Sequence, residues 1–191
     1  APVLRRDALQ EICSQDARYG AMENRYFDED LRQSEDIECW LRLLLLTRYR
    51  LAGIPEALTY YRLNAGGLSA QLHRQFASWE LMLEKIRHLA PDVVAQWGGR
   101  ARAYQLRYLS RQAIRLKDGK AAVTFINRAL ATSGSILSAE TGRTLGTLGA
   151  AYLLYCLPAG CYARLEGTAK AVIGAMQWRS IRKDLTQAPV K

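Results

Sequence analysis

Between residues 27 and 46 the sequence reads Phe27-Asp28-Glu29-Asp30-Leu31-Arg32-Gln33-Ser34-Glu35-Asp36-Ile37-Glu38, then Cys39-Trp40-Leu41-Arg42-Leu43-Leu44-Leu45-Leu46. Apolar side chains recur there with the 3.6-residue period of an α-helix, at Ile37, Trp40, Leu41, Leu44 and Leu45. We therefore expect a helix that starts at Ser34. Because Leu43 and Leu46 add apolar groups on other faces, this helix is expected to be buried on several sides.

The start of this segment is crowded with acid: six carboxylates fall within the eleven residues from Asp28 to Glu38. Such crowding costs repulsion unless cations, a helix N-terminus or a function offsets it. One interpretation is structural, with Ser34 capping the helix and acidic residues filling its first turn. The other is that some of these carboxylates carry out chemistry. The four-residue spacing of Glu38 and Arg42 predicts a structural ion pair.

Short strands are expected on both sides of this helix. Residues 2–6 are predicted to form a strand, and Asp7 to cap a helix over 8–12. Residues 14–34 are polar and irregular, with Gly20 as a breaker. Residues 48–55 are predicted to form a strand ending at a Gly/Pro turn, and 58–63 a second β-rich run.

After residue 70 the apolar spacing is helical throughout. The first helix carries one apolar face and is stopped by Pro91; that face is Leu72, Phe76, Trp79, Leu83, Ile86 and Ala90. A second helix shows Leu106, Leu109, Ala113 and Leu116 and ends at Asp118-Gly119. A third starts at Lys120, and a tight glycine turn is expected to join it to the second as an antiparallel pair. Helix is therefore expected to dominate the chain.

The charge is distributed unevenly along the 191 residues. Lys and Arg total 27 against 18 Asp and Glu, for a net charge of +9. Residues 1–96 have a net charge of −2 and residues 97–191 one of +11. With about half of the residues apolar, the composition excludes a disordered or collagenous chain. The basic second half predicts affinity for polyanions or an anionic membrane surface.

Residues 144–163 contain no charged side chain and are the segment that most resembles a membrane span. Gly146, Gly149, Pro158 and Gly160 interrupt it, so a buried or surface-lying helix is expected rather than a span. The next helix has an apolar stripe from Leu165 to Met176 and a basic, aromatic end at Trp178, Arg179, Arg182 and Lys183. Either it docks on anionic lipid or it closes the domain as an ordinary helix.

Three other features favour ordinary roles. The four cysteines, Cys13, Cys39, Cys156 and Cys161, form no Cys-x-x-Cys pair, which predicts reduced thiols in a cytoplasmic protein. Peripheral attachment to the inner face of the membrane is a further expectation. His73 and His88 lack the context of a catalytic triad and are expected to be structural. Arg107, Arg111 and Arg115, with Tyr104 and Tyr108 nearby, are expected to form a solvated basic stripe, and no nucleic acid partner is expected.

Residues 26–43, in which Glu35-Asp36 opens a helix that ends in an aromatic-Leu-Arg-Leu pattern, resemble the second half of a family-2 glycosyltransferase with the GT-A fold. Other segments resemble the same family in order: Val3 to Leu9, Tyr49-Arg50-Leu51, Ile54 to Leu58, Tyr61 to Asn64 and Leu68-Ser69. The resemblance covers about residues 1–75. It implies that residues 1–70 are the acceptor-side part of a GT-A domain, of α/β class, and that residues 71–191 are a helical C-terminal region.

The resemblance also implies roles for individual residues. Asp36 would be the general base of an inverting transfer from a nucleotide-sugar donor to a glycan or lipid-linked acceptor, and Glu35 would orient that acceptor. Trp40, Asp28 and Asp30 would contact the acceptor, although Trp40 also suits the core. Asn64 stands where many members have His; its amide oxygen can coordinate a metal but cannot transfer protons. Cys13-Ser14-Gln15-Asp16 departs from the family's usual Gly-Gly-Phe-Asp.

The family binds its donor and a divalent metal, Mg or Mn, through an N-terminal half that carries an Asp-x-Asp motif. The Asp-x-Asp here, Asp28-Glu29-Asp30, lies in the acceptor-side loop, which is not the position that the metal-binding motif has in the family. We therefore expect the chain to be the C-terminal part of a longer enzyme, with most metal ligands outside it and no sugar transfer by the chain alone. The alternative is a non-enzymatic helical interaction module that binds membranes or polyanions through its basic half.

Overall fold

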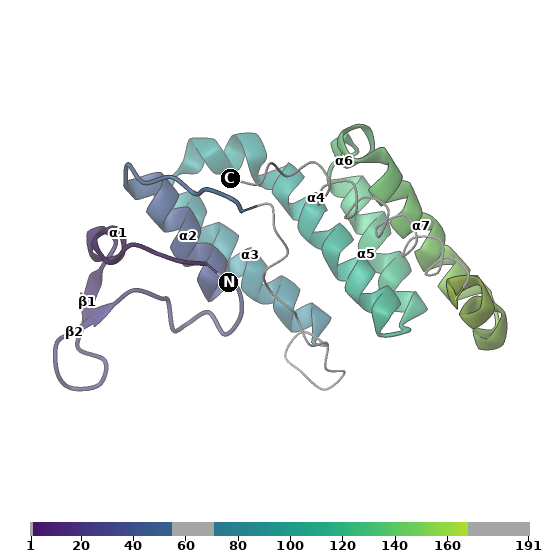
Figure 1. Ribbon diagram of the computed structural model, residues 1–191, viewed down its shortest axis with the longest axis horizontal. Coiled ribbons are helices and arrows are strands. Elements are labelled where there is room, and N and C mark those ends of the chain that lie inside the picture. The colour runs from purple at the N-terminus through teal and green to yellow at the C-terminus, as the bar shows by residue number, and fades with distance from the viewer. Residues whose placement is uncertain (1, 55–70, 168–191) are drawn as a thin grey trace, which may run out of the picture.

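The computed structural model describes residues 2–54 and 71–167 and is dominated by helix, as the periodicity predicts (Figure 1). Its elements are α1 (Arg6–Glu11), β1 (Ser14–Asp16), β2 (Glu23–Arg25), α2 (Glu35–Leu46), α3 (Leu72–Leu89), α4 (Pro91–Arg115), α5 (Gly119–Thr132), α6 (Ser135–Ala139) and α7 (Thr141–Cys156). Residues 159–167 are also helical. In the described part, no helix is both long and apolar enough to cross a membrane.

The N-terminal part differs from the sequence expectation in its short elements. Residues 2–5 are not a strand, and Asp7 lies within α1, which Arg5 precedes. Residues 14–34, expected to be irregular, contain an antiparallel hairpin that pairs Ser14 with Arg25. Its strands are short and mostly exposed, so no apolar alternation marks them in the sequence. Gly20 has φ 98° in the loop between them, consistent with its predicted role as a breaker.

The strand expected at residues 48–55 is absent from its described part, 48–54. Leu51 and Ile54 are exposed there, and the sheet in the described chain consists of β1 and β2. The β-rich run at 58–63 and Asn64 lie outside the described residues.

Helix α2 begins at Glu35, in agreement with the predicted start, and is buried on two sides. Cys39 and Leu43 pack against α1 with Ala8 and Ile12. On the other side, Ile37, Leu41 and Leu45 pack against a cluster centred on α3, formed by Leu31, Trp79, Met82, Leu83 and Ile86. Leu44 and Leu46 remain exposed, so the burial expected from the apolar run is only partial.

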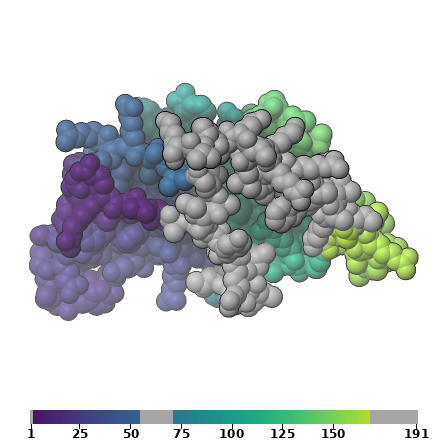
Figure 2. All heavy atoms as spheres, viewed as in Figure 1, coloured from purple at the N-terminus to yellow at the C-terminus, as the bar shows by residue number. Residues whose placement is uncertain are grey.

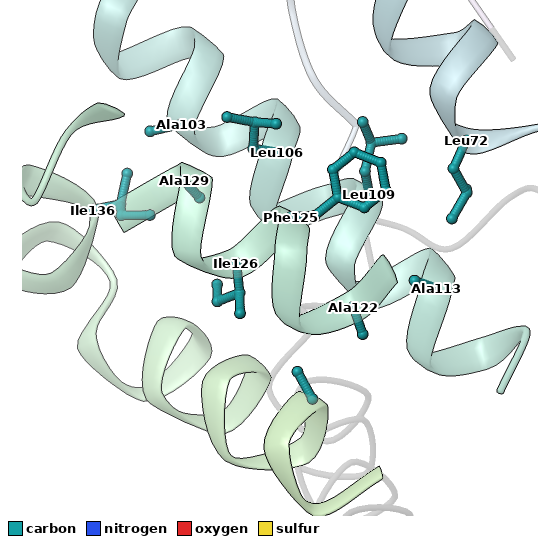
Figure 3. Close-up of a cluster of buried hydrophobic side chains, with 11 residues drawn as sticks. Leu72, Ala103, Leu106, Leu109, Ala113, Ala122, Phe125, Ile126, Ala129 and Ile136 are labelled. Carbon is teal, nitrogen blue, oxygen red and sulfur yellow. The ribbon is translucent and has the colours of Figure 1, made fainter. Parts of the chain in front are cut away.

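The antiparallel pair is formed by α4 and α5 and contains the main core. Leu106 and Leu109 of α4 gather against Phe125 of α5 in Figure 3, and all three are at most 1% exposed. Pro91 ends α3 as predicted and is also the first residue of α4, where its missing N–H costs nothing. The turn between α4 and α5 takes its left-handed residue from Lys117, with φ 62°, rather than from the expected glycine.

The elements follow one another along the long axis, from α1 and the hairpin at one end to α7 at the other (Figures 1 and 2). The domain boundary predicted at residue 70 falls in 55–70, outside the described residues. On either side of it, α2 and α3 share one apolar cluster. The segment that carries the six clustered carboxylates therefore packs against the helical region through α3.

Candidate functional site

Cations pair with four of the six clustered carboxylates. Arg18 lies 3.1 Å from Asp30 and 3.9 Å from Glu29, and Arg25 lies 3.8 Å from Glu29. Further on, Lys85 of α3 pairs with Asp28, and Arg42 with Glu38. These cations offset much of the repulsion that the sequence pattern predicts.

Asp28 is held by partners from two directions. Burial by itself would raise its pKa, but hydrogen bonds from the Lys85 ammonium and the Asp30 N–H outweigh burial, so the pKa of Asp28 lies below its ordinary value. Asp28 is therefore a fixed, ionised acceptor that ties the acidic loop to α3.

The remaining two carboxylates, Glu35 and Asp36, have no ion-pair partner within residues 2–54 and 71–167. They occupy the first turn of α2, where the positive end of the helix dipole stabilises negative charge. Asp36 is exposed, and its Oδ1 accepts a hydrogen bond from the Ile37 N–H at 2.7 Å. The structure therefore leaves an accessible carboxylate with one oxygen fixed against the helix.

Ser34 does not cap α2 as the structural interpretation expects. Its side chain makes no capping hydrogen bond, and its backbone is left-handed, with φ 68° and ψ 13°. A non-glycine residue pays about 1–2 kcal/mol for that conformation. Next to it, the Ser78 hydroxyl of α3 donates to the Gln33 carbonyl and fixes the approach to the helix. Strain of this kind concentrates at functional sites.

Glu38 and Arg42 form the predicted ion pair, and it is largely buried: their side chains are 6% and 14% exposed. The guanidinium also donates to the Ile12 carbonyl at 2.5 Å and to the Tyr26 carbonyl at 2.6 Å. Arg42 thus links α1, the segment after β2 and α2. This network sets the position of the acidic loop against the helix that carries Asp36.

Beside this network lies a hollow of about 440 Å³, within the size range of small-molecule sites. Charged and polar groups dominate its lining, which is Glu11, Ile12, Cys13, Ser14, Arg25, Phe27, Asp28, Asp30, Glu38, Arg42 and Leu46. Phe27 is 45% exposed and offers an aromatic face among the carboxylates. Carboxylates and guanidinium groups together accept from and donate to hydroxyl groups, so the hollow is chemically suited to a polyol.

Two of the predicted acceptor contacts, Asp28 and Asp30, line this hollow, and Trp40 is not among its described lining residues. Trp40 packs instead beside Ala8, Ile12, Cys39 and Leu43, which is the core alternative considered for it. The sequence reasoning missed Phe27 as the aromatic group of the hollow. Its place directly before Asp28 is the signal that could have identified it.

Asp36 is likewise not among the described lining residues of the hollow. Glu35 is not among them either, although it lies one turn before Glu38 on the face of α2 that also carries Glu38 and Arg42. No group of three or more His, Cys, Asp or Glu suited to a metal ion occurs in the described part of the chain. The divalent metal that the family resemblance implies stays a prediction, with most of its ligands expected outside this chain.

The prediction that Arg107 belongs to a solvated basic stripe on α4 is wrong. Its side chain is buried and donates to Thr144 Oγ1 at 2.7 Å and Glu140 Oε2 at 2.5 Å. Arg111 and Arg115 are exposed. Through these hydrogen bonds, the buried Arg107 side chain links α4 to the start of α7. The sequence spacing could not show it, because Glu140 lies 33 residues away.

The two histidines have ordinary surroundings. His73 lies 5.2 Å from the Phe125 ring, measured between ring centroids, and His88 lies 3.3 Å from Glu84 on the exposed side of α3.

Comparison of the chain with protein-family models, with curated proteins and with solved structures found no match.

Proposed function

We propose that this chain is the acceptor-side part of an inverting glycosyltransferase, which transfers a sugar from a nucleotide-sugar donor to a glycan or lipid-linked acceptor. One observation carries the proposal. Of the six clustered carboxylates, Glu35 and Asp36 alone lack an ion-pair partner among the described residues. They are the pair that the family resemblance makes catalytic.

The chemistry requires one unneutralised carboxylate. As the acceptor oxygen bonds to the anomeric carbon, the bond from that carbon to the nucleoside diphosphate breaks, and the hydroxyl proton goes to Asp36. An ion-paired carboxylate is a weaker base, so the lack of a cation partner suits Asp36 to this step. In this proposal the hollow lined by Phe27, Asp28 and Asp30 would hold the acceptor, and Glu35 would orient it. Donor and metal would be bound mostly by residues outside this chain.

The test uses the longer parent enzyme and its sugar-transfer rate. Asp36→Asn should reduce kcat by about 10²–10⁴, the usual contribution of a general base, and should leave donor binding unchanged. Glu84→Gln, which removes an exposed carboxylate of α3, is the matched control and should retain full activity. Near-normal turnover by the Asp36→Asn enzyme would refute the assignment.

A second candidate function, peripheral association with anionic membranes, is favoured by the surface of α7. Four large side chains of this helix are between 41% and 59% exposed: Leu145, Tyr152, Leu153 and Tyr155. Trp178, Arg179, Arg182 and Lys183, the predicted basic end, lie outside the described residues. Sedimentation with acidic liposomes at low and high salt tests this function: salt-sensitive binding supports it, and no binding at low salt refutes it.

A further inference from the structure

A second hollow, of about 560 Å³, lies between α2, α3 and α4 and shares no described lining residue with the first. One side of it is apolar and comes from three helices: Ile37, Leu41, Trp79, Met82, Leu83 and Ala101. Its volume falls in the range of about 300–1,000 Å³ that small-molecule sites occupy. An apolar chain placed there would gain about 0.8 kcal/mol for each CH₂ group removed from water.

The polar side of this hollow belongs to α4 alone, with Tyr104, Gln105, Arg107, Tyr108 and Arg111. Arg107 is already neutralised by Glu140. Arg111 is exposed and has no ion-pair partner among the described residues. The hollow therefore combines an apolar side with one uncompensated cation.

Tyr108 adds a hydrogen-bond donor next to Arg111. Its hydroxyl oxygen accepts from Gln112 Nε2 at 2.7 Å, which leaves the hydroxyl hydrogen available to an oxygen atom of a ligand. A guanidinium binds phosphate or carboxylate oxygens through two parallel hydrogen bonds. The polar side is thus complementary to a single anionic head group.

We propose that this hollow binds a single-chain amphiphile with an anionic head group, the chain lying against α2 and α3 and the head group meeting Arg111 and Tyr108. An alkyl phosphate has this chemistry. The site goes beyond the proposed sugar transfer, because its residues are separate from Asp36 and from the carboxylate-lined hollow.

Calorimetric titration of the 191-residue chain with dodecyl phosphate, below the concentration at which it forms micelles, tests the proposal. Dodecyl phosphate should bind at least tenfold more tightly than inorganic phosphate or the uncharged dodecyl maltoside, because each of these lacks one of the two complementary parts. Equal binding of inorganic phosphate would indicate a plain anion site, and equal binding of the maltoside would indicate non-specific apolar contact. Either result overturns the proposal.

Two variants locate the head group. Arg111→Gln should weaken dodecyl phosphate binding about tenfold, the scale of one charged hydrogen bond. Arg115→Gln, one turn further along α4 and absent from the described lining, should bind like the parent chain. Unchanged binding by Arg111→Gln would overturn the proposal. Circular dichroism verifies that both variants are folded.

A methyl NMR titration locates the chain of the ligand. Signals from Ile37 and Met82, which line the hollow, should shift with dodecyl phosphate, whereas that of Ile136, in the core beside α5, should not. Shifts confined to other regions would place the ligand elsewhere and contradict the assignment.

Discussion

Gly119, the first residue of α5, packs directly on the backbone of Tyr155 near the end of α7. A Cβ atom on Gly119 would lie 2.9 Å from Tyr155 Cα and 3.0 Å from its nitrogen. Real Cβ atoms essentially never come that close to backbone atoms. This glycine is therefore needed for the close approach of two helices, whereas the turn before it takes its left-handed residue from Lys117.

Gly119→Ala should lower the free energy of unfolding by about 1–3 kcal/mol, the usual cost of overpacking, because backbone atoms of α7 must move. Gly149→Ala is the matched control: beyond its own helix, its Cβ would meet no atom of the described residues within 4 Å. Since Ala favours helix over Gly, that control should gain about 0.5–1 kcal/mol. Urea unfolding measures both, and equal effects of the two substitutions would disprove the packing argument.

Arg42→Met should lower the free energy of unfolding by about 3–5 kcal/mol, because it leaves the Glu38 carboxylate buried without its cation. It also removes donors to the Ile12 and Tyr26 carbonyls. Arg5→Met breaks the exposed pair with Asp7 and serves as the control. Exposed pairs contribute little, so that variant should unfold near the parent midpoint. A loss no larger for Arg42→Met than for Arg5→Met would rule out this role of the buried pair.

The sequence predicts the long helices well because their apolar faces are local patterns. The start of α2, the stop at Pro91 and the antiparallel pair of α4 and α5 all follow from spacing within one segment. The hairpin and the absent strand over 48–54 could not be predicted in this way. Strand formation depends on pairing with a partner. The strands of the hairpin carry no alternating apolar pattern, whereas Arg48-Tyr49-Arg50-Leu51 alternates but pairs with no strand in the described chain.

The candidate site is predictable in composition but not in pairing. The sequence shows six carboxylates, and helical spacing identifies Arg42 as the partner of Glu38. It does not identify Lys85 as the partner of Asp28, because the two residues lie 57 positions apart in the chain. It also does not show that Trp40 packs in the core beside α1. These contacts depend on how α2 packs between α1 and α3, which tertiary structure alone determines.

Glu140 should make stability depend on pH. A hydrogen bond from Arg107 is the main cause that holds the pKa of Glu140 below its ordinary value of 4.5; burial opposes this effect, and the charges of Arg107 and Arg143 add to it. Because the folded-state pKa is the lower one, this contribution is present above about pH 4.5 and is lost as the pH falls through the folded-state pKa.

Glu140→Gln should therefore lower stability at neutral pH and flatten the fall in stability below about pH 4.5. Arg143→Gln removes the weaker partner, 3.5 Å away, and should keep most of the parent pH dependence. Urea midpoints measured at several acidic pH values test both variants. An unchanged pH profile in Glu140→Gln would contradict the role assigned to the contact with Arg107.

Ser34→Gly should stabilise the chain, because Ser34 occupies the left-handed region without a side-chain capping bond. Relief of that conformation is worth about 1–2 kcal/mol. The greater freedom of glycine in the unfolded chain costs about 0.5–1 kcal/mol, so a net gain of up to about 1.5 kcal/mol is expected. Ser34→Val should instead destabilise, because a β-branched residue fits the left-handed region poorly. Urea unfolding distinguishes these outcomes, and a loss of stability in Ser34→Gly would show that the serine side chain makes a contribution larger than the backbone strain. Under the proposed function, strain at Ser34 would also hold Glu35 and Asp36 at the start of α2. The Ser34→Gly form of the proposed longer enzyme should then transfer sugar more slowly than the unsubstituted form, whereas unchanged transfer would assign the strain to folding alone.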